Sequence, residues 1–508
     1  MNGIGSLNQV SQETLQLIKD ATKDGMGQAP GLLAKANTTV GITQATGLVW
    51  YDLQTPAKNL FPVITPLVNM IPRVSGNGGT ATNWRAVTAI NVDNLDGGVP
   101  EGVRDGFSKT TEQDYSAAYK TIGAENYVTF EGVNAAVNFE NIRSTTAMRL
   151  LWDAMIRQEL MHLTGDNSVA LGTPTAPTTA AVAGGSVAAN TYNVIVVALT
   201  PRGYRAASVA GGIPTSVSVT PADGSSAFTY GGGSSQKSTA SPVTTAGGNL
   251  TITAYTPVVR GAAAYAWFVG TAGNEVLTAI TTLNSVSITT LAGAGTQNAS
   301  TITADNSTNT YGYDGLLYQA FKTGSNAYIA SLATGTPGVG TKLTTDTAGG
   351  IAEINTMLQS LWDNYRLSPT HLFVNSQQAV DIKTLVIKNN GAPLIRFTGD
   401  FGSGAVGLVA GAVVGEYLNP FSMSGGQLIK MQIHPNMPPG TIFAFTETLP
   451  YPINNVPNVA EYRYRQDWYQ LEWPIRTRRY ETGVYTDGVL AHYFPPSLGI
   501  INNIAAGV

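Results

Sequence analysis

The sequence predicts a mixed α and β protein in which one segment is entirely β-structure. Only 12% of the 508 residues are charged and 56 are glycine, as in chains rich in strands and tight turns. One long amphipathic helix is predicted over residues 140–164. Residues 172–308 are dominated by Thr, Ala, Gly, Ser and Val in short alternating runs, which are typical of a β-sandwich.

The composition excludes several classes of function. The chain has no cysteine, so disulfides, thiolate metal sites and cysteine nucleophiles are excluded. The net charge is −4 with no run of Lys or Arg, whereas a protein that grips DNA directly needs a basic stripe. The chain begins without a secretion signal, and no apolar stretch of about 20 residues could span a bilayer. We therefore expect a protein of a cytoplasm-like compartment, with low-charge faces that other copies cover.

An extended start and a projecting hairpin are expected before the long helix. Residues 1–55 are polar and glycine-dotted, with one short helix at Ser11–Lys23 and little core of their own. The Pro-punctuated stretch 60–74 is expected to be extended and not helical. Residues 75–125 alternate around a Gly- and acid-rich centre, which predicts a long β-hairpin.

The helix over 140–164 has an apolar stripe at near-helical spacing. On its other face Arg149, Asp153 and Arg157 are four residues apart, where opposite charges support a helix. Gly165 is expected to end the helix as a C′ residue. The apolar positions are Met148, Leu151, Trp152, Met155, Leu160 and Leu163.

About seven strands are expected in residues 172–308, enough for one sandwich. Ser225–Ser241, with three consecutive glycines, is expected to be a flexible loop within it. The clearest strand candidates are Asn193–Leu199, Ser216–Val219, Leu250–Tyr255, Tyr265–Val269 and Val286–Thr289.

Ordinary composition returns after the sandwich. Apolar residues at helical spacing predict a helix over 351–365, stopped by Pro369. A buried strand at Leu372–Val374 is expected to lead into a helix capped by Asn375 or Ser376. Roughly the last 60 residues alternate Tyr, Trp and Val with Arg and Glu, as antiparallel strands do.

In this order the elements resemble the major capsid proteins of tailed bacteriophages with the Hong Kong 97 fold. That family has an N-terminal arm, a projecting E-loop, the spine helix of a peripheral (P) domain and an axial (A) domain. Gly165-Asp166 resembles the turn after the spine helix, but the stretch expected next, Asp314-Gly315-Leu316-Leu317, follows only after residue 308. The sandwich is therefore expected to be an inserted domain, and its segment Gly261–Gly270 is similar to fibronectin III or immunoglobulin-like sandwiches.

The resemblance implies a division of the chain. Ser368–Ser376 resembles the passage into the A-domain, Gly411–Val414 its central strand, and Asp487–Ala491 with Phe494-Pro495-Pro496 the closing strands. The implied parts are the arm (1–55), the first part of the P-domain (56–171) with the E-loop (75–125) and spine helix (140–164), the inserted immunoglobulin-like sandwich (172–308), a P-domain and G-loop continuation (309–349), the A-domain with a flanking P-domain helix (350–465), and the closing P-domain strands (466–508).

The family resemblance implies a shell subunit and not an enzyme. Such a subunit forms hexamers and pentamers of an icosahedral head around double-stranded DNA, without sequence-specific DNA binding, and is assembled in the host cytoplasm. Besides other copies, a scaffolding protein, a portal and a cement or decoration protein are the implied partners, and no cofactor or membrane is implied. No long charged scaffolding segment precedes the arm, so a separate scaffolding protein or none is expected.

Candidate contacts between subunits come from the hairpin, the helix and the closing strands. Some family members join an E-loop Lys to a neighbouring Asn by an isopeptide bond, although ordinary surface lysines explain Lys109 and Lys120 far better. The charged residues near the end of the chain, with Glu481, fit either inter-subunit ion pairs or a solvated strand face. The candidates are Trp84, Arg85, Lys109, Lys120, Arg157, Glu472, Arg476, Arg478 and Arg479.

Three motifs that carry chemistry elsewhere are better explained without it. Gly402–Gly407 matches a dinucleotide-binding fingerprint, but glycine-broken, β-branched sequence follows it instead of a helix. Glu159 and His162 have the spacing of a di-metal ligand pair, but the chain has no second such pair, so a solvated helix face is expected. Asp93–Gly97 resembles part of a calcium loop, but Leu95 interrupts its oxygen donors.

Two other functions remain open. A phage tail-tube or decoration protein is also a low-charge structural subunit, but the long helix and the order of the closing strands favour the shell. A secreted carbohydrate-binding or hydrolytic protein with an immunoglobulin-like module is opposed by the missing secretion signal and the lack of a paired-carboxylate signature.

Overall fold

The computed structural model describes residues 61–90, 98–137, 140–291, 297–346, 349–388, 395–398, 407–410, 415–422, 426–452 and 454–507. The chain divides into two units. The first contains residues 1–62 and 136–140, few of which are described, and the second contains residues 63–135 and 141–508. Several predictions lie outside the described residues: the arm, the helix at Ser11–Lys23, Asp93–Gly97, Gly411–Val414, and Gly402–Gly407 apart from its last glycine.

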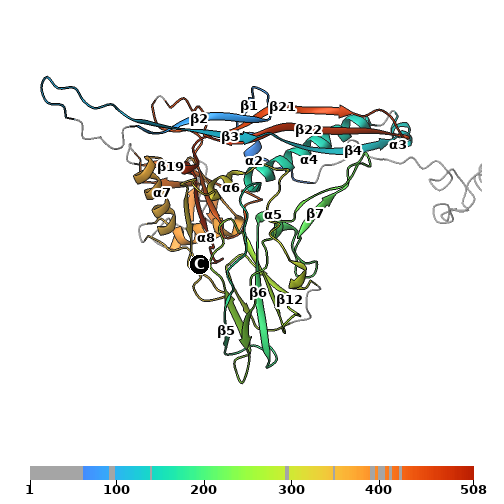
Figure 1. Cartoon of the computed structure of the whole chain (residues 1–508), viewed down its shortest axis with the longest axis vertical. Helices are drawn as coiled ribbons and strands as arrows, with labels where there is room; N and C mark the ends of the chain where they lie inside the picture. The colour runs from blue at the N-terminus through green and yellow to red at the C-terminus, as the bar shows by residue number, and fades with distance from the viewer. Residues whose placement is uncertain are drawn as a thin grey trace, which may run out of the picture. The chain divides into compact units, whose positions relative to one another are not determined.

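The second unit is a mixed α and β structure whose first sheet joins segments far apart in the sequence. Its order is β1 (Arg73–Ser75), β21 (Ala460–Glu472), β22 (Arg479–His492) and β4 (Lys120–Thr129). β1 is parallel to β21 and the other pairs are antiparallel, which confirms the antiparallel strands predicted near the end of the chain. The helix α4 (Ile142–Thr164) packs against β4 and β22 (Figure 1).

The helix predicted over 140–164 is confirmed as α4, but its buried face was only partly predicted. Asn141 caps it, because its side-chain oxygen accepts a hydrogen bond from the backbone N–H of Ser144. Met148, expected in the core, is 48% exposed, and most of the apolar stripe is only half-buried. The fully buried positions include the polar residues Gln158 and Glu159. The apolar stripe of α4 is therefore left incompletely covered within one chain.

The segment before α4 and the last residue of α4 both differ from the prediction. A short helix, α2 (Pro66–Met70), forms where extended chain was predicted, because proline is well tolerated in the first turn of a helix. Gly165 ends α4 with a φ of −58°, not in the left-handed conformation of a C′ glycine. A Cβ atom there would lie 2.3 Å from the carbonyl oxygen of Tyr313, so glycine is needed for close packing and not for a special dihedral angle.

Residues 172–308 contain two packed sheets, so the β-sandwich is observed. Side chains of both sheets share one apolar cluster. β11 is buried along its whole length because Tyr265 and Trp267 point between the sheets, whereas Ala266 and Phe268 pack on the opposite side with Ile213. The first sheet has the order β13 (Ser285–Ile288), β10 (Thr251–Tyr255), β5 (Thr178–Val182), and the second has the order β12 (Val276–Thr281), β11 (Ala264–Gly270), β6 (Thr191–Leu199), β9 (Ser241–Thr244).

The prediction of a flexible loop at Ser225–Ser241 is wrong. Phe228–Gly231 form the strand β8, which pairs with β7 (Ser216–Val219). Ser235 is fully buried, and its hydroxyl oxygen accepts a hydrogen bond of 2.8 Å from the backbone N–H of Ala198. The small residues of this segment serve close backbone packing against β6.

A six-stranded sheet follows the sandwich. The helices α7 (Ala352–Tyr365) and α8 (Ser376–Lys388) share an apolar cluster with it, which confirms both predicted helices. Its order is β14 (Tyr328–Ser331), β23 (Gly499–Asn502), β20 (Ile442–Phe445), β15 (His371–Val374), β19 (Gln427–Ile433) and β18 (Glu416–Asn419). The remaining elements are α3 (Phe130–Ala135), α5 (Pro201–Ala206), η1 (Ala299–Thr301), α6 (Leu316–Phe321), β16 (Ile395–Thr398), β17 (Gly407–Ala410) and η2 (Pro495–Ser497).

The two halves of the motif that the sandwich separates in sequence lie side by side. The backbone N–H of Gly315 donates to the carbonyl of Gly165 at 2.9 Å. One carboxylate oxygen of Asp314 accepts from the backbone N–H groups of Asn167 and Ser168, at 2.8 and 2.9 Å. The chain therefore leaves and returns at one place, as it does where a domain is inserted in a surface loop.

Candidate assembly surface

The long hairpin predicted within 75–125 is confirmed. β2 (Ala81–Ile90) and β3 (Thr110–Ala118) are antiparallel, with a register shift between Val87 and Ala89. They form a two-stranded sheet of their own, with no third strand among the described residues. A two-stranded ribbon is at best marginally stable in water, so this hairpin needs support from another surface.

Apolar side chains are exposed toward the tip of this hairpin. Phe107, in the connection between the strands, is 97% exposed. Ile90, Val99 and Val103 are also largely exposed. Sequence reasoning did not single out Phe107, although a phenylalanine in a Gly- and acid-rich hairpin centre was the signal available.

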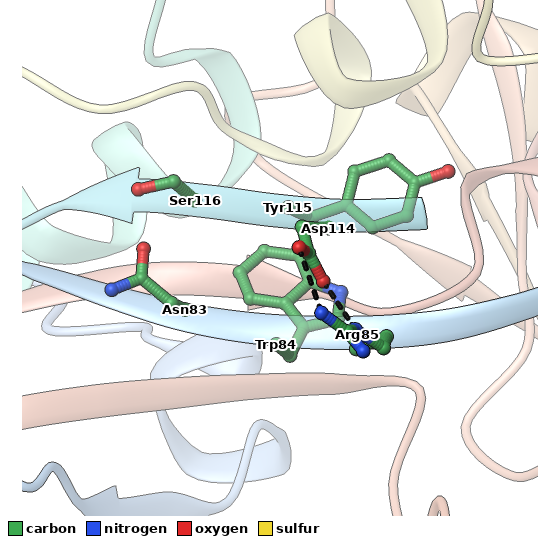
Figure 2. A pocket seen from close by; sticks show the side chains of 6 residues that line it. All are labelled: Asn83, Trp84, Arg85, Asp114, Tyr115 and Ser116. Atoms are coloured by element: carbon green, nitrogen blue, oxygen red, sulfur yellow. Dashed lines mark hydrogen bonds and ion pairs between the residues drawn. The ribbon is translucent and has the colours of Figure 1, made fainter. Parts of the chain in front are cut away.

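A cavity of about 510 Å³ lies over the middle of the ribbon (Figure 2). Its walls come from three successive cross-strand pairs, which are Asn83–Ser116, Trp84–Tyr115 and Arg85–Asp114. The rings of Trp84 and Tyr115 stack with centroids 5.8 Å apart. The indole nitrogen of Trp84 is covered and has no hydrogen-bond acceptor among the described residues. We call this hollow the Trp84–Tyr115 cavity.

An ion pair borders the Trp84–Tyr115 cavity. The Arg85 guanidinium donates to Asp114 at 2.7 Å and to Glu112 at 3.4 Å (Figure 2 draws the bonds to Asp114). The hydrogen bond from Arg85 lowers the pKa of Asp114, and Asp114 in turn raises the pKa of Arg85. These side chains are solvent-exposed, so the pair contributes little to stability and is free to exchange partners.

The base of the hairpin is anchored to the four-stranded sheet region. The ring of Trp84 meets Tyr493 edge-on, with centroids 5.4 Å apart. Arg465 donates to the carbonyl of Gly79 at 2.9 Å and forms an ion pair with Asp487. The base is therefore held by its own chain, whereas the described residues of the tip are largely exposed.

Comparisons with known proteins give a match only at the level of structure. No protein-family model and no curated protein sequence match the chain. The chain is similar to the capsid of a native GTA particle, with 9% identity, 95% of this chain and 100% of the other covered, and a TM-score of 0.41. It is similar to the capsid of cyanophage P-SCSP1u at 8% identity, with 95% and 100% covered and a TM-score of 0.39. The SrpI encapsulin complex of Synechococcus elongatus PCC 7942 matches at 9% identity, with 92% and 96% covered and a TM-score of 0.39.

The structure scatters the other candidate contact residues over several elements. Lys109 is exposed just before β3. Lys120, at the start of β4, donates to the carbonyl of Thr310 at 2.6 Å. Arg157 pairs with Asp153 at 2.9 Å, as the helical spacing predicted.

The last four candidates lie at the end of β21, at the start of β22 and in the connection between these strands, and each has an intramolecular neighbour. Glu472 accepts hydrogen bonds of 3.1 and 3.2 Å from Arg143. Arg478 forms an ion pair with Glu131, and Arg479 pairs with Glu481 at 2.6 Å. Arg476 is exposed and acts on the charge of Asp223. The pKa of Asp223 is lowered by its hydrogen bond from the backbone N–H of Ser225, and the positive charge of Arg476 lowers it further. Of the nine candidates, only Trp84 and Arg85 therefore line one common cavity.

The expectation that Glu159 and His162 lie on a solvated helix face is wrong, since each is only 1% exposed. The Glu159 carboxylate accepts from the backbone N–H groups of Leu67 and Val68, at 2.9 and 2.8 Å, and so caps the start of α2. It also accepts a hydrogen bond of 2.6 Å from Nε2 of His434. These three donors, from segments far apart in the sequence, explain why a charged residue is buried in α4.

The tautomer of His434 follows from its second nitrogen. Its Nδ1 accepts a hydrogen bond of 3.1 Å from the backbone N–H of Asn436, so the proton is on Nε2 and points to Glu159. His162, one helical turn beyond Glu159, contacts the hydroxyl of Tyr313 instead, and burial lowers the pKa of His162 to about 3. The two residues therefore serve separate contacts. Among the described residues no group of three or more His, Asp or Glu side chains is arranged to hold a metal ion.

A buried carboxyl group lies where the chain enters the sandwich. Asp166 is 3% exposed; one of its oxygens accepts from the backbone N–H of Val169, and the other has no partner among the described residues. Burial raises the pKa of Asp166 to about 8, and the neighbouring Asp314 adds to this rise. Burial by itself would raise the pKa of Asp314 too, but Lys322, which pairs with it at 2.8 Å, lowers it. The pair is thus split into one protonated and one ionised carboxyl group.

No helix in the described part of the chain is both long enough and apolar enough to cross a membrane.

Proposed function

We propose that this chain is a major capsid protein, a structural subunit that assembles with copies of itself into the closed icosahedral head of a tailed bacteriophage. The observation that carries the proposal is the unsupported β2–β3 hairpin. Within the described residues it has no third strand, and they leave its apolar tip uncovered, with Phe107 almost fully exposed. Exposed apolar surface of this kind marks a site of protein association.

The incompletely covered helix α4 supports the same proposal. Met148 is exposed, and the apolar residues Leu151, Trp152 and Met155 on the same helix are only half-buried. With only 12% charged residues overall, such faces are more stable when neighbouring copies bury them. A wall around DNA also needs no basic stripe, which agrees with the net charge of −4.

In this proposal each part of the second unit has a place in the shell subunit. The sheet β1–β21–β22–β4 with α4 corresponds to the P-domain, the β2–β3 hairpin to the E-loop, and the six-stranded sheet with α7 and α8 to the A-domain. Hexamers and pentamers, a separate scaffolding protein, a portal and a decoration protein belong to the same proposal, as does assembly in a host cytoplasm. The role is structural, without catalysis.

We further propose that the sandwich is an inserted immunoglobulin-like domain. β5 and β10 are neighbours, as strands B and E are in that fold, and β6, β11 and β12 follow one another as C, F and G do. β13 lies beside β10 but follows all of these strands in sequence, which departs from the order of that fold.

The proposal is tested by producing the full chain in bacteria, alone and with a scaffolding protein, and imaging the particles. Hollow shells, hexamers or pentamers are the expected result, whereas tubes would favour a tail protein. A monodisperse monomer under all conditions, at high concentration and varied salt, would overturn the proposal.

A matched pair of deletions tests the hairpin. Replacing residues 91–109 by Asn-Gly joins β2 to β3 through a two-residue turn and should leave folded subunits that fail to form shells. Shortening the β7–β8 connection at 221–226 removes a surface loop of the sandwich and should leave assembly intact. Unimpaired shells from the first variant would remove the hairpin from the assembly contacts.

A further inference from the structure

We infer that one water molecule binds between the sandwich and the six-stranded sheet, held by the side chain of Asn502 and the hydroxyl group of Tyr265. The water joins β23, in the six-stranded sheet, to β11, an inner strand of the sandwich. These residues lie outside the candidate assembly surface, so the inference does not depend on the proposed function.

A small cavity lies where the two residues meet. It offers about 10 Å³ to the centre of a water molecule, close to the roughly 10–15 Å³ that one buried water needs. Thr282 on the sandwich side and Thr441 on the sheet side add hydroxyl groups to its lining. A cavity with such polar walls holds water, whereas a wholly apolar one stays dry. The rest of the lining consists of Val258, Ala262, Ala263, Pro439 and Asn503.

Asn502 brings a buried acceptor without a donor to this cavity. It is the last residue of β23 and is only 5% exposed. Its side-chain oxygen, Oδ1, is covered and receives no hydrogen bond from any residue that the structure describes. A buried oxygen in this state costs stability, and native proteins pair nearly all such atoms with protein or with water.

The neighbouring side chain of Asn503 cannot supply the missing donor. Its amide already donates to the Asn284 side-chain oxygen at 3.1 Å and to the carbonyl of Leu332 at 2.8 Å. An amide NH₂ group has two hydrogens, so both are in use. The donor for Asn502 must therefore come from another group or from solvent.

Tyr265 contributes an unused donor from the sandwich side. Its hydroxyl oxygen accepts a hydrogen bond of 2.9 Å from the backbone N–H of Val259, but no residue in the described part of the chain accepts the hydroxyl proton. Burial raises the pKa of Tyr265 to about 12, so the proton stays on the oxygen at neutral pH. The hydroxyl group therefore has a proton to donate and no protein acceptor.

One water satisfies both groups at once. It donates one hydrogen to Oδ1 of Asn502 and accepts the proton of Tyr265, and a threonine hydroxyl of the lining can accept its second hydrogen. These are three hydrogen bonds, the usual number for a buried water. A bridge of this kind holds two surfaces together almost as well as a direct hydrogen bond does.

A crystal structure of the full chain, at a resolution that shows ordered water, tests the site directly. The expected result is density for one water within hydrogen-bonding distance of both Asn502 Oδ1 and the Tyr265 hydroxyl. Ordered side chains with no density between them would overturn the inference. A carboxamide of Asn502 that bonds directly to protein would overturn it too.

A pair of variants shows whether Asn502 holds the water. Asn502→Leu removes the acceptor and fills part of the cavity, so the water should be absent from its structure. Asn355→Leu is the matched control on α7, since it removes the hydrogen bonds of Asn355 with Asp346 and Tyr417 and should leave the water in place. A water that persists unchanged in Asn502→Leu would contradict the assigned contact.

Urea midpoints give a readout that does not depend on crystals. Asn502→Leu and Tyr265→Phe act on the same bridge, so the double variant should lower the midpoint by less than the sum of the two single shifts. Tyr265→Phe and Asn355→Leu share no hydrogen-bond partner, and their shifts should add. Additive shifts for Tyr265→Phe and Asn502→Leu would overturn the bridge even if a water lay beside Asn502. If the double variant does not fold, the structure of the parent protein decides alone.

Discussion

Asn284 and Asn503 bind each other through two hydrogen bonds between the sandwich and the end of the six-stranded sheet. The backbone N–H of Asn284 donates to the side-chain oxygen of Asn503 at 3.0 Å, and the Asn503 amide donates back to the Asn284 side-chain oxygen at 3.1 Å. The Asn503 amide also donates to the carbonyl of Leu332 at 2.8 Å. Both asparagines are buried, so the sandwich packs against the end of the six-stranded sheet at this point and is not joined to it by the chain connections alone.

Removing the amide of Asn503 should loosen this docking. Asn503→Ala leaves the buried N–H of Asn284 and the carbonyl of Leu332 unpaired, so we expect the free energy of unfolding to fall by on the order of 3 kcal/mol. Urea denaturation of the subunit measures the loss. Hydrogen exchange at Asn284 should accelerate more than in β15, which lies within the six-stranded sheet.

A glycine at position 503 separates the contribution of the side-chain hydrogen bonds from that of the backbone conformation. Asn503 has a φ of +59°, which alanine tolerates poorly and glycine adopts freely. Asn503→Gly should therefore still show most of the loss in unfolding free energy that Asn503→Ala shows, because the hydrogen bonds of the amide account for more of that loss than the backbone conformation does. If Asn503→Gly matches the parent protein, the bonds between the two asparagines contribute nothing.

The buried carboxylate of Glu159 supplies a second prediction. Glu159→Gln keeps the size of the side chain but replaces one acceptor by an NH₂ group that faces N–H donors. The free energy of unfolding should fall by about 1–3 kcal/mol, the cost of leaving a buried hydrogen-bond donor without an acceptor. The matched control on the same helix is Asp153→Asn, which removes an exposed pair with Arg157 and should cost less than about 1 kcal/mol. Similar urea midpoints for both variants would contradict the proposed role of Glu159.

Periodicity in the sequence predicted most of the elements. The hairpin, the helices α4 and α7, and the strands β7, β10, β11 and β13 were predicted because apolar residues repeat every two positions or every three to four. β6 was predicted from its continuous apolar run and α8 from its cap, whereas β5, β8, β9 and β12 were not named as candidates. β11 shows the limit of this reasoning, since it was predicted as one of the alternating runs but is buried along its whole length, with both faces covered.

Positions fixed by distant parts of the chain were not predictable. Glu159 looked like a solvated residue because its three donors, at 67, 68 and 434, are brought to it only by the fold. The same holds for α2. The local proline content argued against a helix there, but a carboxylate from α4 stabilises it. The Trp84–Tyr115 cavity was predicted only in part: Trp84 and Arg85 were candidates, but their cross-strand partners depend on the register of the hairpin.

The pKa of Asp166 predicts a pH dependence of stability. Its folded-state pKa of about 8 lies above the ordinary value of 3.8, so its stabilising effect is complete below about pH 4 and is lost as the pH rises through about 8. Asp166→Asn cannot ionise and should abolish this part of the pH dependence. The variant should gain stability relative to the parent protein as the pH rises from about 5 to about 8, by at most about 1.4 kcal/mol per pH unit.

The change in slope is the quantity to measure, because the amide introduced by Asp166→Asn would also be a buried polar group without a full set of partners. Urea midpoints of parent and variant are compared at several pH values, with Asp363→Asn, an exposed carboxyl on α7, as the control. Parallel pH profiles for Asp166→Asn and the parent would show that Asp166 is already ionised at neutral pH.

Glycine is required at position 165 for lack of space for a side chain and not for its backbone conformation. Its φ of −58° is open to any residue, but a Cβ atom there would come within 2.3 Å of the Tyr313 carbonyl oxygen and 2.6 Å of the Met161 carbonyl oxygen. Both contacts are with backbone, which cannot rotate away, so Gly165→Ala must push the start of the sandwich away from the end of α4. Overpacking of this kind costs about 1–3 kcal/mol.

Gly78 is the matched opposite case. It has a φ of +83°, and a Cβ atom added there would meet nothing within 4 Å, so Gly78→Ala carries only the backbone penalty of about 1 kcal/mol. We expect Gly165→Ala to lower the urea midpoint more than Gly78→Ala and to speed hydrogen exchange at Asn167 and Gly315, which Gly78→Ala should leave unchanged. Equal stability of Gly165→Ala and Gly78→Ala would contradict this prediction. It would mean that the segment entering the sandwich at Gly165 and the segment leaving it at Tyr313 are less closely packed than the structure shows.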